Sequence, residues 1–260
     1  MANFLQIRHL LLLFTFLLAL TTALFSQPPG GGGPPRRSPE EIKKSIAELT
    51  SQLEKAKADT AKARLTLELA NLTAYQDANA GLEWSKQAIA LAEKTGNEKA
   101  ILNSYLAIGG ILQRLNRFDE ALEYLKKGMP HIEKAKQPDL AGMCYGNIAQ
   151  IYMRQGVYEK SLDFYQKSLA EFEKQPANPD LKAMTLQQIG NLSMRMNKPG
   201  DAVRYFEQAI AIWEKAQNWP RLQGTYQNLG NAYSNLGDEA AAAAAYEKSS
   251  KAGERVKKKD

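Results

Sequence analysis

Apolar and polar positions follow the period of a helix along residues 141–167. Tyr145, Ile148 and Tyr152 fall at positions i, i+3 and i+7, which lie on one face of a helix. Gly156 then marks a turn, and a second helical pattern follows it. Two amphipathic helices joined by a connection of about three residues form an antiparallel hairpin. The pattern therefore predicts a helical hairpin in this stretch.

The same hairpin recurs along the chain at a fixed period. Three kinds of position repeat every 40 or 41 residues: an apolar–small doublet, a large apolar residue before it, and a small residue in the second helix. A period that holds in three independent columns predicts an array of stacked helical hairpins. The columns are Ile108-Gly109, Ile148-Ala149, Ile189-Gly190 and Leu229-Gly230; Tyr105, Tyr145, Leu186 and Tyr226; and Ala121, Ser161, Ala202 and Ala242.

The last hairpin resembles a tetratricopeptide repeat. Its first helix contains Asn228-Leu229-Gly230-Asn231-Ala232-Tyr233, and Gly237, Ala242 and Tyr246 follow at the family's spacing. The resemblance implies an all-α fold, a right-handed superhelical solenoid of stacked antiparallel helix hairpins, with about five repeats and a leading helix. The usual repeat has about 34 residues. The longer period here is similar to that of exported bacterial members of the family and of the input regions of bacterial sensor proteins.

Residues 1–26 have the composition of a secretory signal peptide. Arg8 supplies positive charge, a run without charge extends from Leu10 to Phe25, and small residues precede Gln27. We expect cleavage between Ser26 and Gln27. The alternative is a retained membrane anchor, although the apolar run is shorter than the roughly 20 residues that a spanning helix needs.

Order is expected to begin after a Pro/Gly-rich linker at residues 27–37, which has no apolar residue to start a core. Ser38 and Glu41 have the spacing of a capping box, with a proline at the first helical position. A leading helix should therefore span residues 39–57. Its apolar stripe, formed by Ile42, Ile46, Leu49 and Leu53, should pack on the first hairpin.

The repeat domain is predicted to cover residues 38–255, followed by a basic tail at residues 256–260. Pro138, Pro179 and Pro220 mark three repeat starts, since proline is tolerated in the first turn of a helix. Pro130 lies inside an expected second helix and should bend it. The repeats are expected at about residues 59–96, 97–137, 138–178, 179–219 and 220–255.

Composition argues against several kinds of function. The formal net charge is +6, and part of the excess lies in the tail, so the body offers no basic stripe for nucleic acid. Cys144 is the single cysteine, and His131 is the only histidine beyond the expected signal peptide. Metal sites and nucleophilic triads need more partners than these. We therefore expect neither catalysis nor a cofactor or metal.

The first helices carry polar residues on the face opposite the apolar one. Each triplet has the spacing i, i+3, i+7, so that its members stack on one side of a helix. Carboxamides can bond both the N–H and the C=O of a peptide, and arginines can hold carboxylates. The resemblance places these columns in the concave groove. They are Asn147, Gln150 and Arg154; Gln188, Asn191 and Arg195; Asn228, Asn231 and Asn235; and Arg114 at the last position in repeat two.

These columns have an alternative interpretation as an ordinary solvated face. Such faces are usually richer in Lys and Glu than in Asn and Gln, which favours a binding groove. Repeat one has Leu67, Ala70 and Ala74 near the same positions, so the groove should weaken toward the N-terminus.

The leading hypothesis for function is an exported, periplasmic or secreted, non-enzymatic scaffold that binds a protein or an extended peptide segment. The partner is unknown, and neither nucleic acid nor stable membrane insertion after signal cleavage is expected. The alternative is a sensory input module that acts with a separate signalling partner. The sequence leaves the oligomeric state open.

Overall fold

Every regular element of the described part of the chain is an α-helix. The computed structural model describes residues 38–174 and 178–257, so the expected signal peptide, the whole linker and the last three residues of the expected tail lie outside it. Among the described residues, no helix combines the length and the apolar character that a membrane crossing requires. The helices are α2 (Pro39–Lys55), α3 (Asp59–Thr73), α4 (Ala78–Thr95), α5 (Glu98–Arg114), α6 (Phe118–Gly128), α7 (His131–Ala135), α8 (Pro138–Arg154), α9 (Tyr158–Lys174), α10 (Pro179–Arg195), α11 (Pro199–Lys215), α12 (Trp219–Asn235) and α13 (Glu239–Lys257).

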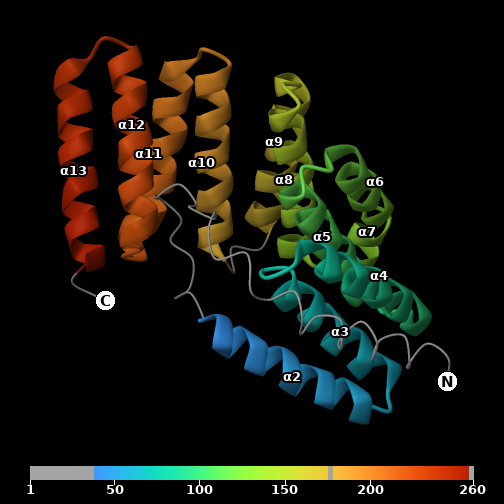
Figure 1. The fold of residues 1–260 in the computed structure, drawn as a ribbon. Coiled ribbons are helices and arrows are strands. Elements are labelled where there is room, and N and C mark those ends of the chain that lie inside the picture. The colour runs from blue at the N-terminus through green and yellow to red at the C-terminus, as the bar shows by residue number, and fades with distance from the viewer. Residues whose placement is uncertain (1–37, 175–177, 258–260) are drawn as a thin grey trace. The chain divides into compact units, whose positions relative to one another are not determined.

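These helices form a stack of antiparallel hairpins. The pairs are α3 with α4, α5 with α6 and α7, α8 with α9, α10 with α11, and α12 with α13, and each hairpin packs on the next (Figure 1). The all-helical solenoid predicted from the period is confirmed. The last helix, α13, continues to Lys257, two residues beyond the end expected for the last repeat.

The turns of the last four hairpins each use the left-handed backbone conformation at one position, whereas the turn between α3 and α4 does not. Asn116, Gly156, Asn197 and Gly237 have φ values of 58°, 78°, 55° and 77°. This residue lets the following N–H reach back to a free carbonyl of the first helix, as in the bond from Val157 N to Tyr152 O of 2.9 Å. Glycine and asparagine adopt this conformation at low cost, which is why they recur here.

The two helices of a hairpin approach closely at the small columns. A Cβ atom added to Gly190 would lie 2.5 Å from Cε1 of Phe206, and one added to Gly230 would lie 2.3 Å from Cε1 of Tyr246. The aromatic ring of the second helix therefore rests directly on the backbone of the first. Only a very small residue fits in the first helix at this crossing.

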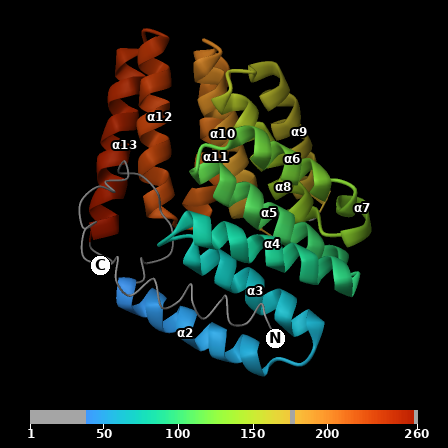
Figure 2. The same cartoon turned by 45° about the vertical axis from the view of Figure 1, so that its right-hand side comes forward.

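The leading helix differs in two respects from expectation. The capping box is confirmed, with Glu41 N donating to Ser38 Oγ at 3.2 Å and Ser38 N to Glu41 Oε2 at 2.6 Å. However, α2 ends at Lys55 rather than at residue 57, because Ala56 takes an extended backbone. The helix packs along α3 (Figure 2), but none of its residues is fully buried, so its apolar stripe is only half covered.

Pro130 interrupts its helix instead of bending it. Helix α6 ends at Gly128, and α7 starts anew at His131. Proline has no N–H to donate and its ring clashes with the preceding turn, so the regular bonding stops there. The short α7 still packs on α5, where the His131 ring stacks on Tyr105 with centroids 6.1 Å apart.

The core consists of three clusters of buried side chains. The first runs from Ala63 in α3 to Ile151 in α8, and the second runs from Ala183 in α10 to Ala252 in α13. The third joins α8 and α9 to α10, and it contains Ala149, Met153, Tyr165, Ile189 and Leu192. Each cluster is shared by neighbouring hairpins, so each hairpin is stabilised by the next one.

Candidate functional site

Most of the predicted groove residues meet around one hollow between α8, α10 and α12. This space, which we call the groove hollow, has a volume of about 610 Å³. Seven of the ten predicted residues line it. They are Gln150 and Arg154 from α8, Gln188, Asn191 and Arg195 from α10, and Asn228 and Asn231 from α12.

Three predicted residues do not line the groove hollow. Asn147 is half-buried one turn before Gln150, and Asn235 is exposed at the last position of α12. Arg114 lies over the ring of the exposed Tyr75, with Cζ 5.4 Å from the ring centroid. The helical spacing is the same for these residues, but the neighbouring helices do not enclose their positions. That any of the ten binds a ligand stays a prediction.

Three apolar residues complete the lining, and the sequence reasoning missed them. Met153 and Met194 each precede the arginine of their column, and Phe206 comes from α11. Phe206 reaches the groove hollow because it crosses the backbone at Gly190. The methionines lie 41 residues apart, so a search for repeated apolar positions beside the polar columns could have found them.

The carboxamides of the groove hollow are only partly engaged. Asn228 Nδ2 donates to Asn191 Oδ1 at 3.1 Å, which links two neighbouring first helices. The phenol of Tyr246 donates to Asn231 Oδ1 at 3.0 Å. Within the described residues, the side chains of Gln150 and Gln188 have no hydrogen-bond partner. The Asn191 amide N–H groups and the Asn228 carbonyl thus remain available beside two free glutamine side chains.

The charge of the groove hollow is positive and is not compensated locally. Arg154 and Arg195 are both exposed, and within residues 38–174 and 178–257 neither forms an ion pair. No carboxylate is among the lining residues. Arg154 Cζ lies 5.9 Å from the centroid of the Phe118 ring. Two guanidinium groups without acidic neighbours favour an anionic ligand.

A buried hydroxyl lies beneath the α8 side of the groove. Tyr165 of α9 is 2% exposed, and its phenol oxygen has no hydrogen-bond partner within the described residues. Burial raises the pKa of this phenol, and the nearby Arg154 guanidinium opposes the shift. Tyr246, which holds the same position in the last hairpin, donates to Asn231 instead. The corresponding column residue beside Tyr165 is Gln150, which is not bonded to it.

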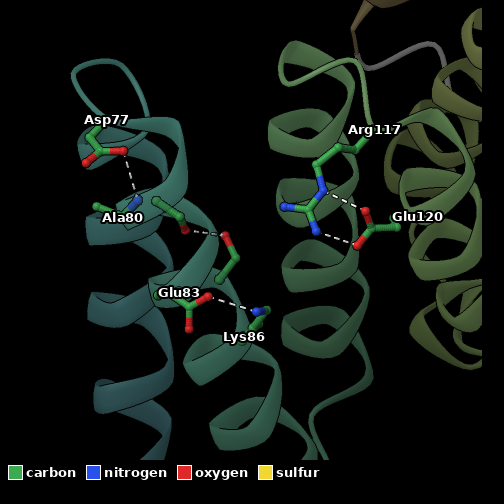
Figure 3. A network of polar contacts seen from close by, with 8 residues as sticks. Asp77, Ala80, Glu83, Lys86, Arg117 and Glu120 are labelled. Atoms are coloured by element: carbon green, nitrogen blue, oxygen red, sulfur yellow. Dashed lines mark hydrogen bonds and ion pairs between the residues drawn. The ribbon is translucent and has the colours of Figure 1, made fainter.

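The charged cluster on α4 and α6 is compensated within itself (Figure 3). Lys86 Nζ lies 2.8 Å from Glu83 Oε1, and Arg117 donates twice to Glu120, each time at 2.6 Å. The Arg117 guanidinium lowers the pKa of the Glu120 carboxyl. These pairs are exposed and separated by three residues, so they contribute little to stability. With its charges already paired, this cluster is a weaker candidate for binding than the groove hollow.

The groups considered for catalysis lie apart from the groove hollow. Cys144 is fully buried, and burial raises the pKa of its thiol to about 12, which keeps it protonated. His131 contacts Glu98 at the start of α7. The described residues contain no group of three or more His, Cys, Asp or Glu side chains placed to hold a metal ion.

A family model described as tetratricopeptide repeat matches residues 141–215 and again 182–255, and a second model with the same description matches residues 102–129. Together these ranges cover more than half of the chain. The chain belongs to the tetratricopeptide repeat family. Members of this family are repeat scaffolds for protein–protein interaction and are typically not catalytic.

Individual relatives are distant. The photosystem I assembly protein Ycf3 of Synechococcus sp. (strain CC9902) is 30% identical over 108 residues, which are 42% of this chain and 57% of that protein. The match thus spans less than two thirds of the relative's length.

Two solved structures resemble the fold of this chain. BtubC (BKLC) from P. vanneervenii has a TM-score of 0.73 and 19% identity, covering 83% of this chain and 92% of that one. The type IV pilus biogenesis factor PilW has a TM-score of 0.62 and 19% identity, covering 79% and 83%. At this identity the likeness concerns the fold alone.

Proposed function

We propose that this tetratricopeptide repeat protein is a non-enzymatic scaffold that binds an extended, acidic protein segment in the groove hollow. The observation that carries this proposal is the lining itself. Two unpaired arginines and five carboxamides face one space that contains no acidic residue. Scaffolding of protein partners is a property of the family, and the finer statement about the groove is ours.

The lining suits a peptide backbone with carboxylate side chains. Asn191 and Asn228 offer donors and an acceptor to the N–H and C=O groups of an extended segment. Arg154 and Arg195 stand one hairpin apart, so they would receive two separate carboxylates along that segment. Met153, Met194 and Phe206 would cover apolar side chains between them. The Synechococcus relative is named an assembly protein, which is consistent with binding segments of other proteins.

The test is a selection of ligands from a random peptide library on the purified protein, followed by calorimetry. Selected peptides should be rich in Asp and Glu. Substitution of Arg154 or Arg195 by Ala should weaken their binding by about 1.5–3 kcal/mol each, the value of hydrogen bonds to charged groups, and added salt should reduce this difference.

The matched control is Arg204→Ala. Arg204 is an exposed arginine on α11 that already pairs with Asp201, so its loss should leave peptide affinity unchanged. Selection of neutral or basic peptides, or equal losses in all three variants, would contradict the proposal. A sensor kinase recovered as the natural partner would support the alternative, a sensory input module.

We also propose that the protein is exported, on the composition of residues 1–26. N-terminal sequencing of the protein from its native compartment should start near Gln27. A full-length chain recovered from the cytoplasm would contradict export.

A further inference from the structure

One aromatic column of the array is interrupted in its last hairpin. The second helices of three hairpins carry Tyr124, Phe164 and Tyr205 at a spacing of 40 and 41 residues. The next position in the series, 40 residues further on, is Ala245 in α13. The last hairpin therefore lacks a ring that the preceding ones supply.

The ring has a defined place in the earlier hairpins. Phe164 packs between two tyrosines of α8, with its centroid 6.2 Å from that of Tyr145 and 5.6 Å from that of Tyr152. The ammonium of Lys167 lies over the Phe164 ring, 4.8 Å from its centroid. The second hairpin repeats this arrangement in part, with one tyrosine neighbour and the lysine, because Leu112 stands at the position that corresponds to Tyr152. There the Tyr124 ring lies 6.5 Å from Tyr105, and Lys127 stands 5.2 Å above Tyr124.

In the last hairpin the corresponding place is a hollow of about 300 Å³, which we call the tyrosine hollow. Its floor consists of Tyr226, Leu229 and Tyr233 of α12, and Ala241, Ala244 and Ala245 line it from α13. Helices α11, α12 and α13 lie side by side in Figures 1 and 2. The two tyrosines correspond by the repeat period to Tyr145 and Tyr152, the residues that hold the Phe164 ring.

The neighbouring side chains are also smaller or displaced. Ala241 and Ala244 stand where the preceding hairpin has the ion pair of Asp201 and Arg204. Lys248 occupies the column of Lys127 and Lys167, but it lies over the floor ring of Tyr226, 5.6 Å from the centroid. Because Ala245 has no ring, the Lys248 ammonium lies over the ring of Tyr226 in α12 instead.

The polar groups at the rim are satisfied and leave negative charge on one wall. Tyr226 donates to Glu214 Oε1 at 2.5 Å, and Tyr233 donates to Glu207 Oε1 at 2.9 Å. Both glutamates belong to α11 and line the tyrosine hollow. In each glutamate only Oε1 accepts the tyrosine hydrogen bond. The two Oε2 atoms could therefore accept from a cation beside the tyrosine hollow.

We propose that the tyrosine hollow is a docking site for a partner protein segment that presents an aromatic side chain next to a Lys or Arg. The ring would lie between Tyr226 and Tyr233, as Phe164 lies between its two tyrosines, and the basic residue would pair with Glu207 or Glu214. This site is separate from the groove hollow. It uses the face of α12 opposite to Asn228 and Asn231 and does not depend on the function proposed there.

The probe is a short capped peptide that contains Phe followed by Lys. Two matched peptides accompany it, one with Ala in place of Phe and one with Glu in place of Lys. Binding to the protein with labelled alanine methyl groups is followed by NMR. The Phe-Lys peptide should shift the methyl resonances of Ala241, Ala244 and Ala245 in a saturable manner. The Ala peptide should bind at least about tenfold more weakly, since burial of a large apolar side chain is worth a factor of that order.

The protein variants separate this site from nonspecific binding. Ala245→Phe restores the ring of the earlier hairpins, so it should raise the melting temperature and weaken the Phe-Lys peptide by about tenfold or more. Ala243→Phe is the control, because Ala243 is an exposed residue of the same helix that does not line the tyrosine hollow. It should leave both properties unchanged. The double variant Glu207→Gln with Glu214→Gln should abolish the preference for Lys over Glu.

Three outcomes would overturn the proposal. The first is a lack of methyl shifts at the highest soluble peptide concentration. The second is equal binding of the Phe and Ala peptides. The third is self-association in sedimentation that Ala245→Phe abolishes, because the hollow would then receive a second copy of this chain instead of a partner.

Discussion

Helix α12 has two faces of opposite chemistry, and each lines a different hollow. Asn228 and Asn231 face the groove hollow, where amide groups and two arginines lack full partners. Tyr226 and Tyr233 face the tyrosine hollow, where both hydroxyls are bonded to glutamates and the missing component is an aromatic ring. The groove hollow thus has polar groups without hydrogen-bond partners, whereas the tyrosine hollow has an apolar space that no side chain fills. We expect ligands of the first to be more sensitive to salt than ligands of the second.

The largest loss of stability is expected from substitutions at the crossing of α10 and α11, where packing positions a residue that lines the groove hollow. Gly190→Leu should displace Phe206, which lines the groove hollow and lies against the glycine backbone. Ala202→Leu should force apart α10 and α11, the two helices that cross at Gly190. Each should cost about 1–3 kcal/mol of unfolding free energy through overpacking. Thermal unfolding measures this loss, and for Gly190→Leu binding in the groove should fall with it.

Gly110→Leu is the control for this pair. A Cβ atom at Gly110 would meet nothing within 4 Å, although Gly110 directly follows Gly109 of the small column. Its melting temperature should not fall. An unchanged melting temperature in Gly190→Leu as well would mean that the helices do not cross at this residue.

The second-largest effect is expected on peptide binding, from substitution of the carboxamide residues of the groove. Substitution of Ala for Asn147, Gln188, Asn191, Asn228 or Asn231 should weaken peptide binding by about 0.5–1.5 kcal/mol if that residue holds the ligand backbone. Asn147 lies outside the groove hollow, so its effect should be the smallest of the five. The effects of Asn191→Ala and Asn228→Ala should not add in the double variant, since the two residues share a hydrogen bond.

Calorimetry and thermal unfolding together decide this prediction. Gln188 forms no side-chain hydrogen bond within the described residues, so stability should stay nearly constant in Gln188→Ala, whereas Asn231→Ala loses the bond from Tyr246 and should lose as much stability as Tyr246→Phe. Lost stability with intact binding would show that the carboxamides are structural, and the partner would then dock elsewhere.

The smallest effect compares two equivalent tyrosines. Tyr165→Phe removes a buried hydroxyl without a partner in the described structure, so stability should stay equal or rise by up to about 1 kcal/mol. Tyr246→Phe removes the bond to Asn231 and should lose about 0.5–1.5 kcal/mol. Urea unfolding of both variants measures the difference. A clear loss in Tyr165→Phe would indicate that its hydroxyl does have a partner in solution.

Much of the fold could be predicted because it depends on local, repeated features. The small columns at Gly190 and Gly230 have to repeat wherever an aromatic ring crosses a backbone, so they reveal the period. Pro130 also has a local effect, and the sequence indicated a disturbance at the right place but not that the helix would stop.

The candidate site was predictable only in part. Helical spacing puts Gln150, Gln188 and the other residues of their columns on one side of their helices, and seven of these residues line the groove hollow. Which of them line a hollow depends on the side chains that neighbouring helices place around them, and this is why Arg114, Asn147 and Asn235 lie outside the groove hollow although their spacing is the same. The alanine run of α13 shows in the sequence as a closely packing stretch, but its importance depends on the ring that the preceding hairpins carry at the position of Ala245.

The division of the core has a consequence for how the protein unfolds. The groove hollow runs from α8, whose Ile148 and Ile151 belong to the first core cluster, to α12, whose Leu229 belongs to the second. In a repeat array, neighbouring units can lose structure separately. A segment bound along the groove would contact helices of both core clusters. At a ligand concentration of about a hundred times the dissociation constant, binding would raise the free energy of unfolding by about 2.7 kcal/mol. Unfolding should then become a single, sharper transition, with the partner coupling the two halves of the array.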